Sequence, residues 1–340
     1  MKPLEGFDFP ALRELLGTLK ADGWLLYDFH GINPAATRVL GINGMGTRRF
    51  FVLLPRAGAP VAIAHRIELA SFEGFPGEVR PYAAWSELHE RLRALVGGKT
   101  VAMEISRDDA VPYLDRVPHG VIELIEGFGT KVVSSGTLVS RFAARWSPSE
   151  LAGHRRAAEA LAEIAVETLR WAGAQLAAGD VLLLDLWAGP ALGSVFADQT
   201  WMGYAGNMPG AEERKIWETV RSARDAAVNL LKERWAMRQP VTGASLDDAA
   251  RGVIRAAGYG EFFVHRTGHS IDRDLHGSGP HLDNFETADE RMLIPGVGFS
   301  VEPGIYLPGR LGMRTEINVY LGDAGPEVTP SRPQQDLLLV

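Results

Sequence analysis

Apolar and polar residues follow two different periods along the chain, and the change of period predicts two kinds of element. An apolar spacing of three to four residues favours an amphipathic helix, whereas short apolar runs or strict alternation favour strands. Helices are predicted over residues 10–21, 86–96, 148–171, 211–235 and 245–257. Strands are predicted at 24–28, 101–105, 181–189 and 195–206. The chain therefore mixes helices and strands.

The first part of the chain alternates strands with helices. Residues 48–65 read as a hairpin with a Pro-Arg-Ala-Gly turn, Ser86 is the expected N-cap of its helix, and VIELIEG and TKVVSS are further strand candidates. This order indicates an α/β domain over residues 1–146. The stretch GINGMG at 41–46 lacks GxGxxG spacing, so a loop is predicted there, with phosphate binding as the alternative.

A second domain, residues 147–340, is expected to begin at a capping box. Ser147 suits the N-cap, Pro148 the first helical position, and Glu150 the third. The segment 189–194 (GPALGS) is the expected turn between two strands that each carry one acid, Asp185 and Asp198. Ser245 with Asp248 is the expected start of the last long helix, and Gly258 its end.

The most unusual stretch is 262–320. Its first half holds three histidines in a Gly-rich setting, His265, His269 and His276. Its second half holds Glu302 and Glu316, each within an apolar, β-rich segment, with turn residues between them. A hairpin here would bring both carboxylates to one face. Two such carboxylates repel, so one protonates unless a cation lies between them.

Composition narrows the classes of function. The chain has 340 residues, is 46% hydrophobic and 23% charged, carries a formal net charge of -7 and contains no cysteine. A nucleic-acid partner is not expected, and any metal must use oxygen and nitrogen ligands. The start MKPLEGFDFP does not resemble a signal peptide, and no apolar run approaches the ~20 residues of a membrane span. A cytoplasmic protein without a membrane partner is predicted.

Five residues form a candidate metal set. Four of them have a structural alternative: Asp185 or Asp198 as a turn cap, Glu302 as the partner of an arginine, and His269 as a core histidine. Together with Glu316, however, they supply four carboxylates and one imidazole, which two divalent cations would neutralise. This donor set suits Mn²⁺, Co²⁺ or Zn²⁺. Thr200, on the same strand face as Asp198, is expected to hydrogen-bond beside the site.

The order Asp…Asp…His…Glu…Glu, with HRTGHSI, SVEPGIY and RTE around the last three, resembles the pita-bread (M24) metallopeptidases. These include Xaa-Pro dipeptidase (prolidase), Xaa-Pro aminopeptidase and methionine aminopeptidase. The resemblance covers nearly the whole chain. It implies an α/β N-terminal creatinase-like domain, an α+β pita-bread catalytic domain, and two divalent metal ions, with Mn²⁺ as first choice.

The resemblance also implies roles. It makes Asp185 a ligand of one metal, Asp198 and Glu316 bridging ligands, and His269 and Glu302 ligands of the other metal. Glu302 also matches the general base for the attacking water. His265 and His276 match histidines that contact substrate, with His276 stabilising the oxyanion. Arg314, which could orient Asp198 or meet a substrate carboxylate, and Tyr306 match further motif positions.

The match is incomplete in the first half of the second domain. The family has a further helix, a strand and a substrate-contacting histidine where this chain has only WAGAQLAAGD between Trp171 and Val181. His154 is read as part of a solvated helix face and not as a substitute. Such a deletion would open one side of the substrate pocket.

The expected activity is hydrolysis of Xaa-Pro bonds by a homodimer, with a small peptide that has proline at its second position as substrate. A prolidase is the first reading. An Xaa-Pro aminopeptidase on longer peptides, a non-catalytic binding protein on the same fold and a metal-free creatinase-like hydrolase stay open. A prolidase must capture the proline carboxylate; Arg314, His265 or a loop of the N-terminal domain from a partner subunit could do so. Residues 28–49, with Asp28, Arg48 and Arg49, are the candidate for that loop, and a surface salt bridge is the alternative for these three residues.

Overall fold

The computed structural model describes residues 2–42, 46–173 and 175–340, and it divides the chain into two compact units. The first unit is Met1–Ala143 and the second is Ala144–Val340. Residues 43–45 of the predicted loop 41–46 lie outside the described residues. Gly41 ends a helix in the left-handed conformation that glycine adopts without strain.

The first unit is built on a six-stranded sheet in the order β4-β3-β2-β1-β5-β6. Strand β1 pairs with β5 in parallel and with β2 in antiparallel orientation. The strands are β1 (Gly23–Asp28), β2 (Phe50–Pro55), β3 (Val61–His65), β4 (Glu78–Tyr82), β5 (Thr100–Met103) and β6 (Lys131–Ser134). The helices are α1 (Phe9–Thr18), α2 (Pro34–Leu40), α3 (Trp85–Val96), α4 (His119–Glu126) and α5 (Gly136–Phe142).

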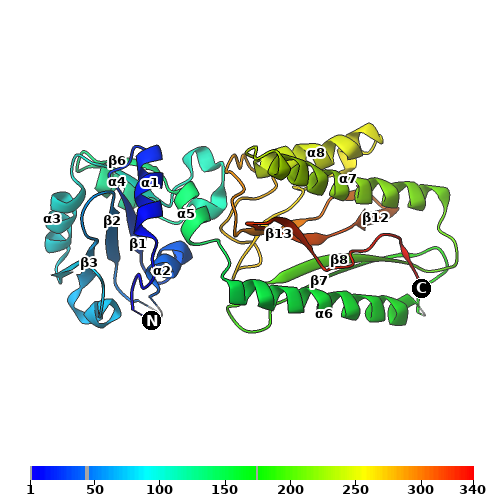
Figure 1. The fold of residues 1–340 in the computed structure, drawn as a ribbon, viewed down its shortest axis with the longest axis horizontal. Coiled ribbons are helices and arrows are strands. Elements are labelled where there is room, and N and C mark those ends of the chain that lie inside the picture. Colours follow the sequence, from blue (N-terminus) through cyan, green and yellow to red (C-terminus); the bar gives the residue numbers. More distant parts are fainter. Residues whose placement is uncertain (1, 43–45, 174) are drawn as a thin grey trace. The chain divides into compact units, whose positions relative to one another are not determined.

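Helices cover both faces of this sheet because its strands are apolar on both faces (Figure 1). In β1, Trp24 and Leu26 belong to a core cluster shared with α1, α2 and α5. Their neighbours Leu25 and Tyr27 belong to the opposite cluster, shared with α3 and α4. Successive side chains of a strand point to opposite faces, so one buried strand serves both cores.

Two details of the first unit differ from the sequence expectations. The segment VIELIEG lies in helix α4, where Val121 and Ile125 are buried at helical spacing, so the strand prediction was wrong. Helix α3 begins at Trp85, and its N-cap Ala84 makes no side-chain capping bond, so Ser86 lies inside the helix. The hairpin 48–65 is confirmed as the antiparallel pair of β2 and β3.

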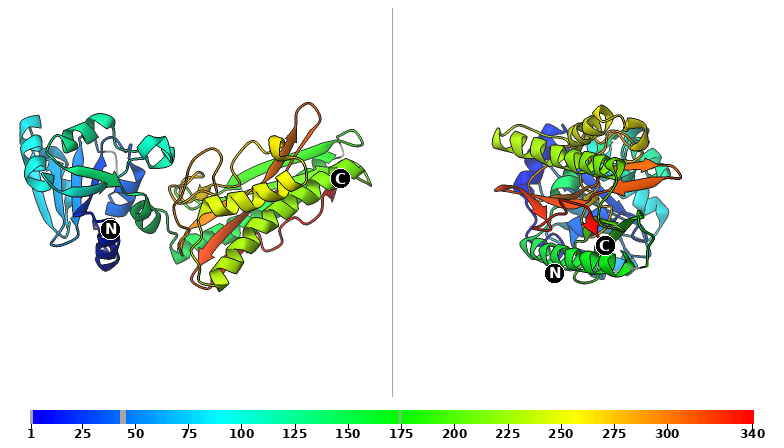
Figure 2. Two further views of the ribbon diagram at one scale, coloured as in Figure 1. Left: turned by 90° about the horizontal axis from the view of Figure 1, so that it is seen from above. Right: turned by 90° about the vertical axis from the view of Figure 1, so that its right-hand side faces the viewer.

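The second unit has long helices on both sides of several small sheets (Figures 1 and 2). Its helices are α6 (Pro148–Gly173), α7 (Ala211–Ala236) and α8 (Gly243–Ala256). Its strands are β7 (Val181–Ala188), β8 (Ala197–Tyr204), β9 (Ser270–Ile271), β10 (Gly298–Val301), β11 (Gly304–Leu307), β12 (Leu311–Arg314), β13 (Ile317–Gly322), β14 (Gly325–Thr329) and β15 (Leu338–Leu339). No helix in the described ranges is both long and apolar enough to cross a membrane.

The capping box that begins α6 is confirmed. The Ser147 amide donates to the Glu150 carboxylate at 2.7 Å, and the Glu150 amide donates back to the Ser147 hydroxyl at 3.3 Å. Helix α8, in contrast, is capped by Thr242, whose hydroxyl accepts from the Ser245 amide at 3.2 Å. Ser245 is therefore the residue that is capped and not the cap.

Helices cover the two halves of the second unit unequally. On one side, α7 and α8 lie together over the sheets that contain β12 and β13 (Figure 1). On the other side, α6 packs against β7 and β8, and residues 175–180 connect it to β7 with no helix or strand of their own. Strand β7 consequently lies at the edge of the sheet β15-β8-β7, and none of its residues is fully buried. The apolar Trp187 of this strand is 53% exposed.

His154 lies in the core of the second unit and not on a solvated face, so that expectation was wrong. Its side chain is fully buried. Nδ1–H donates to the Phe196 carbonyl at 2.7 Å, which leaves Nε2 to accept from the Thr329 hydroxyl at 2.8 Å. Burial lowers the pKa of His154 to about 4. The imidazole joins helix α6 to the start of β8 and the end of β14 as a neutral group.

We expect His154 to make the stability of the protein depend on pH. Its folded-state pKa of about 4 lies below the usual histidine value of 6.5, so the unfolded chain binds the proton first. The contribution is complete above about pH 6.5 and is lost as the pH falls toward 4, at a total cost of about 3 kcal/mol. Urea unfolding of the protein and of His154→Gln between pH 4 and 8 measures this difference. Parallel pH profiles of the two proteins would contradict the assignment.

Candidate metal centre

The two aspartates of the predicted metal set lie on a strand pair. Strands β7 and β8 are antiparallel, with Asp185 opposite Thr200 and Trp187 opposite Asp198. The enlarged turn 189–194 therefore leaves the two strands in continuous register, as predicted. Asp198 is buried, whereas the side chain of Asp185 is 37% exposed because it lies on the edge strand.

The other three ligand candidates lie where short strands begin or end. His269 directly precedes β9, Glu302 directly follows β10, and Glu316 directly precedes β13. Strand β10 pairs with both β9 and β13, which places these three positions close together. The predicted hairpin exists, but it is interrupted: β10 pairs with β13, β11 pairs with β12, and each glutamate lies at the break between the two ladders.

The carboxylates and the imidazole converge as predicted. One ligand atom each of Asp198, His269 and Glu316 lies within 4.8 Å of the others. His269 Nε2 is 3.3 Å from Asp198 Oδ2 and 3.5 Å from Glu302 Oε1. Asp185 joins the group through Arg314, whose guanidinium forms an ion pair with it. The predicted five residues thus form one cluster.

Thr200 and Arg314 tie the acids together. Thr200 Oγ1 accepts from Arg314 Nε at 2.8 Å and lies 3.1 Å from Asp185 Oδ1 and 2.7 Å from Glu316 Oε2. One hydroxyl proton serves only one of these two carboxylates at a time. Arg314 also lies 3.6 Å from Glu302 Oε2. The partners of Thr200 are thus Asp185 and Glu316, where the sequence indicated a place beside Asp198.

The electrostatics of the cluster call for a further cation. Burial raises the pKa of Glu316 well above its usual value, and Glu302 and Asp198 raise it further. Burial also raises the pKa of Asp198, although His269 opposes the rise. Burial lowers the pKa of His269, but its contacts with Asp198 and Glu302 outweigh this effect, and the net pKa is raised. Without an added positive charge, the site therefore takes up protons.

Two atoms are oriented as metal ligands. The Nδ1–H of His269 donates to the Ser270 carbonyl at 3.0 Å, so the lone pair of Nε2 in the neutral imidazole faces the carboxylates. Glu316 Oε1 is buried and has no hydrogen-bond partner. A lone pair facing anions and an unsatisfied buried oxygen are both costly, and a divalent cation among these atoms satisfies both. The residues present therefore fit a metal centre.

The predicted substrate residues border this cluster. His265 Nε2 lies 2.7 Å from the Tyr306 hydroxyl, and the ring of His276 lies 4.2 Å from that of His269. Burial lowers the pKa of His265 and, with help from His269, lowers that of His276 to about 4. Burial raises the pKa of Tyr306 to about 12. Both histidines are therefore neutral at pH 7, and Tyr306 keeps its proton.

Sequence reasoning missed Ser300. Its hydroxyl accepts from the His269 amide at 2.9 Å and donates to Glu302 Oε1 at 3.0 Å, so it links two ligand candidates. The sequence did indicate this contact, because Ser300 lies two residues before Glu302 in a strand, and residues i and i+2 of a strand face the same side.

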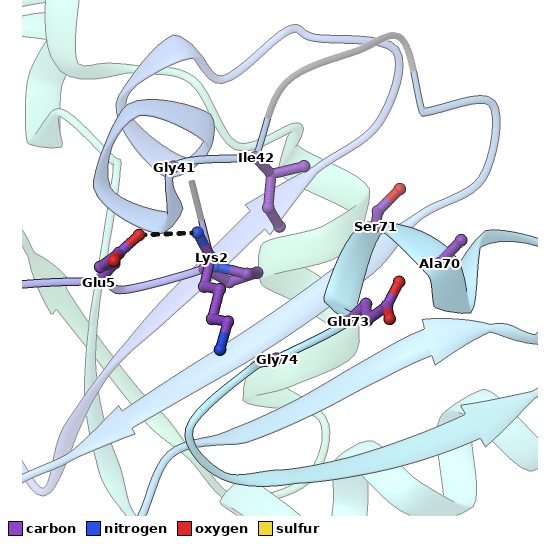
Figure 3. Close-up of a pocket in the computed structure, with 9 residues that line it drawn as sticks. Lys2, Glu5, Gly41, Ile42, Ala70, Ser71, Glu73 and Gly74 are labelled. Atoms are coloured by element: carbon purple, nitrogen blue, oxygen red, sulfur yellow. Dashed lines mark hydrogen bonds between the residues drawn. The ribbon is translucent and has the colours of Figure 1, made fainter.

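In the first unit, the segment 28–49 suggested for capture of a substrate carboxylate stays a prediction, and its residues 43–45 lie outside the described part of the chain. Asp28 of this segment is buried and accepts from the Gly31 amide at 3.0 Å and the Asn33 amide at 2.9 Å, so it stabilises a turn. A cavity of about 710 Å³ in this unit is shown in Figure 3. Its charged lining residues are Lys2, Glu5 and Glu73, and the Lys2 amide is bonded to Glu5 at 3.0 Å.

Comparisons with known proteins agree with this centre. The family model of metallopeptidase family M24 matches residues 154–323, which is half of the chain. The "Probable dipeptidase PepE" of Mycobacterium tuberculosis is 26% identical over 319 residues, covering 81% of each chain. The Xaa-Pro dipeptidase of Lactobacillus helveticus is 38% identical over 108 residues, covering 32% of this chain and 27% of its own length. The crystal structure of dipeptidase PepE from Mycobacterium ulcerans superposes with a TM-score of 0.74 at 22% identity, covering 97% of this chain and 96% of that one.

The chain belongs to metallopeptidase family M24. The family resemblance and the fold class expected from the sequence are both confirmed: an α/β N-terminal domain is followed by an α+β pita-bread domain.

We expect Glu316→Gln to separate metal binding from stability. In the presence of a chelator the variant should melt at a higher temperature than the parent protein, because the folded parent must take up a proton at this buried carboxylate, whose pKa is raised well above its usual value, whereas the amide needs none. Mn²⁺ at about 100 times its dissociation constant should stabilise the parent by about 2.7 kcal/mol and the variant far less. Thermal melts with chelator or Mn²⁺ measure both effects. The exposed Glu163→Gln serves as control, and equal Mn²⁺ responses in all three proteins would contradict the assignment.

Proposed function

We propose that this protein hydrolyses Xaa-Pro dipeptides with the help of two divalent metal ions, Mn²⁺ in the first instance. The observation that carries the proposal is the convergence of four carboxylates and His269, with Glu316 Oε1 buried and unpartnered among them. The similarity to a protein named Xaa-Pro dipeptidase supports the substrate class. When bound, the metal ions supply Lewis acidity and lower the pKa of water.

The ligand roles are part of this proposal. Asp185, Asp198, His269, Glu302 and Glu316 would hold the two ions, with Asp198 and Glu316 as the ligands that both ions would share. The burial of four of these side chains, with Asp185 at the edge, is consistent with this division. Co²⁺ and Zn²⁺ suit the same donors, and the choice of Mn²⁺ stays a prediction.

The residues around the metal ligands also have roles in the proposed reaction. Glu302 removes the proton from the attacking water, and Ser300 holds its Oε1 in place at 3.0 Å. His276, neutral at pH 7, donates a hydrogen bond to the carbonyl oxygen as negative charge develops there. His265, Tyr306 and Arg314 would contact the substrate. A proline carboxylate would bind Arg314 once bound metal ions balance the acids with which its guanidinium pairs in this structure.

Longer Xaa-Pro peptides are a second candidate substrate class. The observation in their favour is the half-exposed edge strand β7, which carries Asp185 of the centre. A dipeptidase needs a closed end to its pocket, and the short connection between α6 and β7 provides no helix that could close this side. The substrate test below therefore includes a longer peptide.

We further infer that residues 1–146 form the creatinase-like domain and residues 147–340 the catalytic one. A homodimer and a cytoplasmic location stay predictions. Metal binding does not exclude a non-catalytic binding protein on the same fold, because such a protein could also retain metal. Only measured hydrolysis of a peptide excludes it.

The direct test compares a Xaa-Pro dipeptide with a Xaa-Pro-Xaa tripeptide, each with Mn²⁺ and with chelator. We expect metal-dependent release of free proline from the dipeptide, because Arg314 is available to the terminal carboxylate. Cleavage of the tripeptide alone would replace the prolidase assignment by that of an aminopeptidase.

Arg314→Lys is a matched variant for this experiment, since it keeps the charge but loses the planar fork. It should raise the KM for the dipeptide more than that for the tripeptide. Absence of cleavage of either peptide by folded, Mn²⁺-loaded protein would refute the proposed function.

A further inference from the structure

A second buried polar cluster lies beside the metal centre, on helix α8. It consists of Asp247 and Arg251, one helical turn apart, with Thr267 of the loop that leads to His269. We propose that Asp247 and Arg251 are positioning residues that hold His265 and Glu302 in place for the reaction. The inference rests on the proposed function for its kinetic readout, but not for its spectroscopic one.

Asp247 holds two separate loop segments. Its Oδ1 accepts from the Thr267 amide at 2.9 Å and from the Thr267 hydroxyl at 2.6 Å. Its Oδ2 accepts from the Asn284 amide at 3.0 Å. The carboxylate is completely buried, so each of these donors depends on it for a partner.

Arg251 holds the backbone on the other side of His265. Its guanidinium forms two bonds of 3.1 Å with the Asp247 carboxylate. It also donates to the Phe263 carbonyl at 3.1 Å and to the His265 carbonyl at 2.6 Å. The guanidinium carbon lies 4.2 Å from the ring centroids of both Phe263 and Phe285, so the planar group is held between two rings.

The Asp247–Arg251 pair is connected to the reacting groups through two short series of hydrogen bonds. The Thr267 carbonyl accepts from the Glu302 amide at 2.7 Å, so a shift of Thr267 moves the backbone of the proposed general base. The His265 ring lies 2.7 Å from the Tyr306 hydroxyl, so a shift of the His265 backbone breaks or lengthens that bond. The loop between η4 (Gly260–Phe262) and β9 contains one isolated antiparallel bridge, between Gly268 and Leu282, and the buried ion pair holds the segment before that bridge.

The pair is suited to this task by its chemistry. Arginine offers five donors in a rigid fork, which matches one carboxylate and two carbonyls at once. Lysine keeps the charge but not the fork. A buried pair of this kind is weak evidence for stability, since apolar replacement is often neutral, whereas removal of one partner leaves an unpaired charge.

The experiment uses the full-length, Mn²⁺-loaded protein and the variants Arg251→Lys and Thr267→Val. The second variant removes one hydroxyl and serves if the first does not fold. Asp248→Asn is the control: this exposed neighbour on the same helix bonds the Asn284 side chain at 2.9 Å and lies outside the proposed cluster. Each protein is assayed for bound Mn²⁺, for kcat and KM, and, in its metal-free form, for the imidazole ¹⁵N signals of His265 by NMR.

We expect Arg251→Lys to lower kcat at least tenfold with bound Mn²⁺ unchanged and to shift the His265 signals, and Thr267→Val to do the same to a smaller extent. Asp248→Asn should match the parent in all readouts. Folded variants that keep the parent kcat and the parent His265 signals, whatever their melting temperatures, would overturn the proposal. If the parent protein cleaves no Xaa-Pro peptide, the proposed function fails, and the His265 signals alone decide the positioning role.

Discussion

Repulsion among four carboxylates in one small space is the constraint on which the catalytic unit depends. Asp198, Glu302 and Glu316 are buried, Asp185 is close by, and Arg314 is the cation that touches three of the four. One guanidinium does not balance four acids, and burial together with the neighbouring carboxylates accordingly raises the pKa of Glu316 and of Asp198. Both glutamates lie where a strand is interrupted. Hydrogen bonds from the side chains of Thr200 and Ser300 hold the acids together against this repulsion.

The two halves of the catalytic unit meet this constraint differently. The half with β10 and β13 lies under α7 and α8, and its ligand candidates are buried. The half with β7 and β8 has α6, and its edge strand leaves Asp185 partly exposed. An edge strand with apolar side chains exposes both unpaired backbone groups and apolar surface. The same exposure makes Asp185 the most solvent-accessible of the five ligand candidates.

Most of the fold and of the metal cluster could be predicted from the sequence, because the residues involved lie in local motifs. The acids within apolar strands, the histidines in a Gly-rich loop and the capping box at Ser147 each depend on neighbours in the chain. Some failures were local: VIELIEG forms a helix, and Ser86 and Ser245 do not cap theirs. The others depend on packing at long range. His154 reads as exposed beside two arginines, yet it bonds Phe196 and Thr329 from other elements. The ties between Thr200 and Glu316 and between Arg251 and His265 span 116 and 14 residues. The Asp247–Arg251 pair did leave a signal, since opposite charges one turn apart fall on the buried face that carries Leu246, Ala250 and Ile254.

The central claim is that two divalent cations balance these carboxylates. Anomalous diffraction from crystals of the Mn²⁺-loaded protein, recorded at the manganese edge, tests it most directly. The account predicts two peaks, one beside Asp185 and one beside His269 and Glu302, with Asp198 and Glu316 contacting both. No peak at the cluster, or one peak that leaves Glu316 Oε1 without a partner, would contradict it.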